Sequence, residues 1–92
     1  PRYQRLAETL GVAGDVVFLG DQSDPVPSYH AADVFVLPTL YDPCPLVVIE
    51  ALACGLPVIT TNYSGATELM SLPRDGVVIN DPMDITELSF AM

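Results

Sequence analysis

The stretch YDPCPLVVIEALACGLP, residues 41–57, places a single glutamate inside an apolar run. The apolar residues from Leu46 to Cys54, followed by Gly55, predict a helix that ends at the glycine. Glu50 lies about one turn inside that helix. Asp42 stands in the loop before it, which two prolines stiffen. Because buried charges are costly, an acid in such a helix raises the question of what it binds.

Short apolar runs alternate with helical patterns along the rest of the chain. Strands buried on both faces are predicted over residues 16–19, 34–37, 57–60 and 76–79. Helices are predicted over residues 2–10, 27–32, 46–54, 65–70 and 84–92, the last capped by Asp84 or Asp81. This alternation predicts an α/β fold with a parallel sheet of about four strands and right-handed crossovers.

The length and charge of the chain limit its function. Its 92 residues allow one domain, and it carries twelve acidic residues, three arginines and no lysine, a formal net charge of −9. Such a surface repels nucleic acid and anionic membranes. The missing lysine excludes P-loop, kinase and Schiff-base chemistry. No apolar run is long enough to span a membrane, and a start at Pro1 without a signal peptide suggests a piece of a longer protein.

The cysteines and the histidine indicate neither a disulfide nor a metal site. Cys44 and Cys54 would lie about 15 Å apart along the predicted helix, too far for a disulfide. Free thiols favour a reducing compartment, so we expect a cytoplasmic protein. His30 is the only histidine, and no cysteine pair has ligand spacing. We therefore expect no metal and no cofactor.

The predicted position of the loop from Thr39 to Pro45 indicates a binding site. It follows a strand and precedes a helix, so it lies at the carboxyl edge of the sheet, where ligands bind in such folds. The backbone N–H groups of Leu46 and Val47 would favour a phosphate. Glu50 would repel that phosphate but could accept hydrogen bonds from ribose hydroxyls. With Asp42 accepting from a second polyol, the pattern predicts a nucleotide-sugar.

The quoted stretch, extended to YDPCPLVVIEALACGLPVITTNYSGATEL, resembles the donor-binding segment of family-four retaining glycosyltransferases of the GT-B fold. The motif of that family is an acidic residue, seven residues and Glu, followed by Ala-x-Ala-x-Gly-x-Pro-Val. The blocks VVFLG, ADVFVLPT and DGVVINDP also match. The resemblance implies that residues 1–92 are part of a Rossmann-like, carboxy-terminal donor-binding domain of a hexosyltransferase.

The resemblance also implies roles for individual residues. Glu50 would bind the ribose of a nucleoside diphosphate, and Asp42 would contact the transferred sugar as the catalytic-site acid. The sugar and diphosphate would lie along the backbone of four residues, Cys44, Pro45, Leu46 and Val47. The sequence departs from the family pattern at two points, so the resemblance does not identify the transferred sugar. The first acid is usually Glu but is Asp42 here, and the following loop is usually rich in glycine but holds two prolines here.

Some parts of the family's active site are not found in this sequence. An Arg and a Lys early in the same domain neutralise the leaving diphosphate, and an amino-terminal domain holds the acceptor. With no lysine here, the 92 residues are expected to be inactive alone. The expected partners are a nucleotide-sugar and an unknown acceptor, with the complete protein in the cytoplasm or at a membrane surface. An open sheet edge is a further expected point of self-association.

Other functions and plainer roles stay open. A non-catalytic nucleotide-sugar-binding or scaffold module is one alternative, and a sugar-nucleotide epimerase is another; a phospho-receiver would need a lysine. Glu50 could instead reach solvent or pair with an arginine, and Asp42 could form a turn with Pro43. Glu68 could complement a helix dipole, and Gly65 could serve either a tight turn or a close approach to a ligand.

Overall fold

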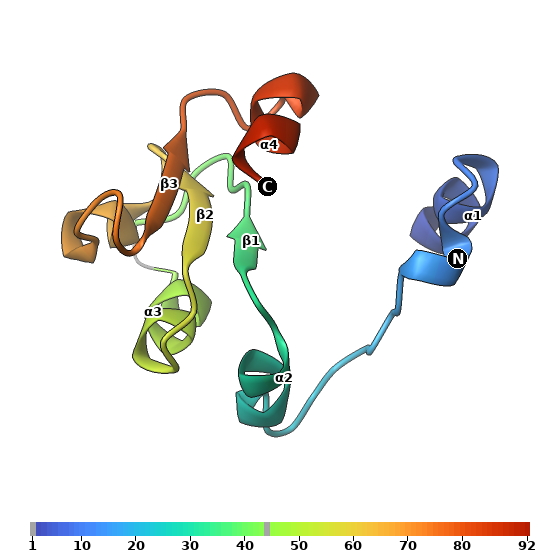
Figure 1. Ribbon diagram of the computed structural model, residues 1–92, viewed down its shortest axis with the longest axis horizontal. Helices are drawn as coiled ribbons and strands as arrows, with labels where there is room; N and C mark the ends of the chain where they lie inside the picture. The colour runs from blue at the N-terminus through green and yellow to red at the C-terminus, as the bar shows by residue number, and fades with distance from the viewer. Residues whose placement is uncertain (1, 44) are drawn as a thin grey trace.

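The computed structural model describes residues 2–43 and 45–92, which form an α/β fold (Figure 1). Its α-helices are α1 (Arg2–Thr9), α2 (Val26–Ala31), α3 (Leu46–Ala53) and α4 (Ile85–Ala91). Two short 3-10 helices are η1 (Ala13–Asp15) and η2 (Gly65–Leu69). The strands β1 (Phe35–Leu37), β2 (Val58–Thr61) and β3 (Gly76–Ile79) make one parallel sheet in the order β1-β2-β3. The predicted fold class is confirmed.

The middle strand, β2, is the centre of the fold. Val58 pairs with Phe35 of β1 and with Gly76 of β3, and all four β2 residues are buried. A strand with a neighbour on each side and helices above it has no face in water, which explains the apolar Val58 and Ile59 at its start. The strands predicted over 34–37, 57–60 and 76–79 are therefore confirmed, with small shifts at their ends, but burial on both faces holds only for β2, since β1 is half-buried and Val77 of β3 is exposed.

The strand predicted over residues 16–19 is wrong. The backbone is extended at Val16, but Val17 is 78% exposed and Leu19 59% exposed. Figure 1 shows this segment within the long connection from α1 to α2, away from the sheet. An apolar run indicates burial, but a strand forms only where a neighbouring backbone pairs with it. Among the described strands none pairs with this segment, so the sheet has three strands rather than about four.

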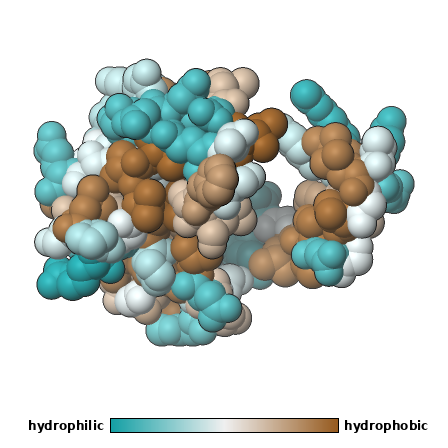
Figure 2. All heavy atoms as spheres, turned by 45° about the horizontal axis from the view of Figure 1, so that its top comes forward, coloured by the Kyte–Doolittle hydropathy of each residue, from teal (hydrophilic) through white to brown (hydrophobic). Residues whose placement is uncertain are grey.

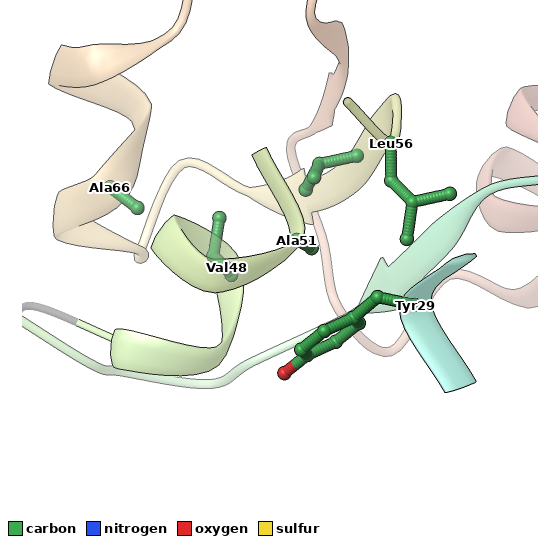
Figure 3. Close-up of a cluster of buried hydrophobic side chains, with 6 residues drawn as sticks. Tyr29, Val48, Ala51, Leu56 and Ala66 are labelled. Carbon is green, nitrogen blue, oxygen red and sulfur yellow. The ribbon is translucent and has the colours of Figure 1, made fainter. Parts of the chain in front are cut away.

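The hydrophobic core lies where α2, α3 and η2 meet the sheet. Its buried members are Tyr29, Val48, Ala51, Leu56, Val58 and Ala66. Figure 3 shows the Tyr29 ring reaching from α2 towards α3. Because α2 and α3 share this cluster, their relative position is set by close packing and not by a direct connection in the sequence.

Apolar side chains are exposed on α1 and at Leu10, directly after it. Tyr3, Leu6 and Leu10 form the predicted helical stripe but are 65%, 49% and 65% exposed. Figure 2 shows apolar surface on this lobe as well as on the main body.

An open groove of about 1000 Å³ separates residues 15–19 from α2. Of the described helices, none is both long and apolar enough to cross a membrane.

Candidate functional site

Two buried threonines of β2 hold the loop that follows β1. The Thr60 hydroxyl donates to the carbonyl oxygen of Leu37 at 2.9 Å, and the Thr61 hydroxyl donates to that of Thr39 at 2.6 Å. Both threonine side chains are fully buried. A hydroxyl in a dry environment needs a partner, so these bonds fix the loop at the carboxyl edge of the sheet. The sequence reasoning missed this role, because it placed Thr60 at the end of a predicted strand and left Thr61 outside it.

Asp42 is held by the connection that follows β2. Its backbone N–H donates to the carbonyl of Tyr63 at 3.1 Å, and its own carbonyl accepts from the N–H of Gly65 at 2.7 Å. These bonds form an isolated parallel bridge between Asp42 and Ser64. Asp42 is half-buried. The residue is therefore fixed in space by two loops, whatever turn it makes with Pro43.

Gly65 is required by a close backbone approach. A Cβ atom at this position would fall on the carbonyl group of Pro43. Any side chain would therefore push apart the two loops that hold Asp42. The sequence left open a tight turn or a close approach to a ligand, and the structure shows a further reason for this glycine, which is its contact with the Pro43 backbone.

The amino end of α3 is open to solvent. Pro45 precedes the helix and is buried, while Leu46 and Val47 are 68% and 41% exposed. The N–H groups of Val48 and Ile49 both donate to the carbonyl of Pro45, so the N–H groups of the two residues before them lie ahead of the first intrahelical bond. Such an end carries a partial positive charge and favours an anion. Cys44, predicted to line this site, lies outside the described residues.

Glu50 projects from α3 and bonds to a residue of α2. Its side chain is exposed, and its Oε2 accepts a hydrogen bond from the Tyr29 hydroxyl at 3.0 Å. Tyr29 is only 7% exposed. Burial raises the pKa of the Tyr29 hydroxyl, and the nearby Glu50 carboxylate raises that pKa further. The partner of Glu50 is therefore a tyrosine that the sequence reasoning did not single out, because it lies 21 positions away.

Two of the remaining candidates are exposed surface groups, and the third, Cys54, is half-buried against the core. Glu68 stands in the first turn of η2 and is exposed, as is His30 at the end of α2. Cys54 is a free thiol. Within residues 2–43 and 45–92, no three side chains of the His, Cys, Asp and Glu types gather to hold a metal ion. The groove beside residues 15–19 is lined by neither Asp42 nor Glu50, so it is not this site.

Comparison with known proteins identifies the family of the chain. The family model described as "Glycosyl transferases group 1" matches residues 1–92. The chain therefore belongs to the glycosyl transferases group 1 family. It is 32% identical to the lipopolysaccharide glucosyltransferase WaaG of Escherichia coli K12 over 88 residues, 96% of this chain and 24% of that protein.

A second relative is the GDP-mannose-dependent alpha-(1-6)-phosphatidylinositol monomannoside mannosyltransferase of Mycolicibacterium smegmatis. It is 36% identical over 98 residues, covering 97% of this chain and 25% of the relative. Among solved structures, the crystal structure of WaaG superposes with a TM-score of 0.86 at 31% identity, over 98% of this chain and 24% of WaaG. The chain thus matches part of the GT-B glycosyltransferase fold and spans about a quarter of the length of these relatives.

Proposed function

We propose that this chain is part of the carboxy-terminal donor-binding domain of a retaining glycosyltransferase of family four. It binds a nucleoside-diphosphate sugar whose hexosyl group is transferred to an acceptor with retained configuration. The observation that carries this proposal is Glu50, an exposed carboxylate tethered about one turn from the open amino end of α3. The GDP-mannose named for the mannosyltransferase relative supports a nucleotide-sugar donor.

The proposed pose follows the charges of the site. The diphosphate lies against the α3 amino end, where the N–H groups of Leu46 and Val47 favour anions. The ribose lies towards Glu50, which accepts from its hydroxyls, and the sugar lies towards Asp42. The backbone from Cys44 to Val47 runs along the sugar and diphosphate. A carboxylate and a phosphate repel one another, so this order keeps both acids away from the diphosphate.

Catalysis in this proposal depends on position and charge. Asp42 is fixed by its backbone bonds to Tyr63 and Gly65. It holds the sugar while the bond between the sugar and the diphosphate breaks. The developing charge on the diphosphate is stabilised by the α3 amino end and by cationic side chains outside these 92 residues. We expect no metal or cofactor. The isolated chain is expected to transfer no sugar, and detectable transfer would contradict this.

The remaining partners and the location are also proposals. The complete protein acts in the cytoplasm or at a membrane surface, on an acceptor that the sequence does not specify. Nucleic acid is not expected as a partner, because the net charge is −9. Self-association is proposed for the isolated chain, through the edge of β1 that does not face β2.

Titration calorimetry with UDP and GDP tests the proposal. The complete gene product, its Glu50→Ala variant and the control Glu8→Ala would be compared; Glu8 is an exposed acid on α1. Loss of charge-assisted bonds to ribose is expected to weaken nucleoside-diphosphate binding roughly 10- to 100-fold in Glu50→Ala. The control should bind as the unmodified protein does. Equal affinity in all three proteins would remove the proposal.

A further inference from the structure

We propose that Tyr29 is a positioning residue for donor binding: its hydroxyl holds Glu50 so that the second carboxylate oxygen, Oε1, meets the ribose. This inference rests on the proposed function of Glu50 and adds a residue of a different helix to the site. Tyr29 itself need not touch the ligand. Its role is carried by the 3.0 Å hydrogen bond to Oε2.

The ring of Tyr29 is fixed by the core. It is 7% exposed and packs edge-on against Phe35 of β1, with ring centroids 5.9 Å apart and an interplanar angle of 67°. Figure 3 shows the ring within the buried cluster and its hydroxyl directed out of it. A donor on a rigid ring presents one fixed direction. The long and exposed Glu50 side chain therefore loses freedom before the ligand arrives, which lowers the cost of binding.

The hydrogen bond to Tyr29 also keeps the Glu50 carboxylate away from the position proposed for the diphosphate. An untethered Glu50 could turn back towards the amino end of α3, about 6 Å away along the helix axis, where it would compete with the diphosphate. The bond to Tyr29 directs it towards α2 instead. The Tyr29 hydroxyl is a donor at neutral pH, because its pKa is raised from an ordinary value of 10.0.

Binding of two probes to the complete gene product tests the inference. Tyr29→Phe keeps the ring but removes the hydroxyl, and Tyr3→Phe on the exposed face of α1 is the control. Tyr29→Phe is expected to weaken UDP or GDP binding about fivefold. Its affinity for inorganic pyrophosphate, which has no ribose, should fall by less, because only the repulsion from the released Glu50 carboxylate acts on that probe. Combined with Glu50→Ala, it should add no further loss, because the tethered group is already absent.

Each outcome decides between the two proposals. Unchanged affinity in Glu50→Ala would remove the proposed function and this inference with it. If Glu50→Ala binds UDP more weakly while Tyr29→Phe binds it as the unmodified protein does, only the positioning role of Tyr29 is overturned. Equal losses for UDP and pyrophosphate in Tyr29→Phe would mean a structural role and would also overturn it.

A second variant covers the case in which Tyr29→Phe does not fold. A fluorinated tyrosine at position 29 keeps the hydroxyl but releases its proton at a lower pH. Its phenolate would repel Glu50, so UDP affinity should fall as the pH is raised, while the unmodified protein shows no such fall. Matching pH profiles for the two proteins would overturn the inference.

Discussion

The backbone N–H of Gly65 donates to the carbonyl oxygen of Asp42 at 2.7 Å, which joins the loops after β1 and β2 at the carboxyl edge of the sheet. The bond is possible because residue 65 has no side chain to meet Pro43. The position of the candidate sugar-binding acid thus depends on a glycine more than twenty residues away. The Gly65 of the GATEL block is therefore required for the packing of the two loops.

Gly65→Ala is expected to disturb that junction. Its methyl group would overlap the Pro43 backbone, which cannot rotate away as a side chain can, so the free energy of unfolding should fall by about 1–3 kcal/mol. Donor affinity should fall with it. Urea unfolding and calorimetry on the complete gene product would measure both. Gly14→Ala is the control, because open space surrounds that position. Similar behaviour of the two variants would contradict the explanation.

Thr61→Val should destabilise the loop after β1. The change keeps the branched shape but removes the donor to Thr39, and it also removes the acceptor for the N–H of Tyr63. Leaving a part-buried carbonyl and a part-buried N–H without their partners costs about 1–3 kcal/mol. Thr86→Val on the exposed side of α4 should change the free energy of unfolding by less than about 0.5 kcal/mol. Chemical denaturation compares them, and equal losses would count against the loop bond.

Tyr29 predicts a loss of stability at high pH. Its folded-state pKa lies above the ordinary 10.0, so the folded protein keeps a proton that the unfolded chain releases. The stability that the raised Tyr29 pKa contributes is fully present below pH 10.0 and is lost as the pH rises through the folded-state pKa. Tyr29→Phe should therefore lose less stability than the unmodified protein above pH 10.0. Urea unfolding on both sides of this pH checks it, with Tyr3→Phe as control, and identical slopes for all three proteins would refute it.

Asp84→Ala should weaken α4. The Asp84 carboxylate accepts from the N–H of Glu87 at 3.0 Å and caps the helix. Losing a cap costs about 1 kcal/mol, whereas Asp84→Asn retains an accepting oxygen and should cost little. Thermal unfolding of the two variants separates capping from charge. If the alanine and asparagine variants melt together, the cap does not stabilise the helix.

The open edge of β1 predicts association of the isolated chain. Phe35 directs its N–H to Pro57 beside β2, so the N–H of Val36 points to the other edge. Sedimentation velocity on residues 1–92 should show association that increases with concentration. Val36→Pro removes the edge donor without touching the bonds to β2 and should reduce that association. A monomer at every concentration, or equal association by the variant, would exclude this edge.

The local sequence determined much of this protein. Apolar runs located β1, β2 and β3, and Gly55 ended α3 near the predicted point, since hydrophobic patterning and turn chemistry act over a few residues. Asp84 was one of two predicted caps and is the one observed. The motif around Glu50 indicated the glycosyltransferase family, which the comparison confirmed.

Only the tertiary structure decided which groups meet. Val17 has the sequence of a buried strand but stays exposed and unpaired among the described residues, because pairing depends on a neighbour and not on the run itself. The partner of Glu50 is Tyr29, and the partner of Gly65 is the loop of Asp42 and Pro43. These contacts join separate segments through packing, and spacing along the chain carries no signal of them.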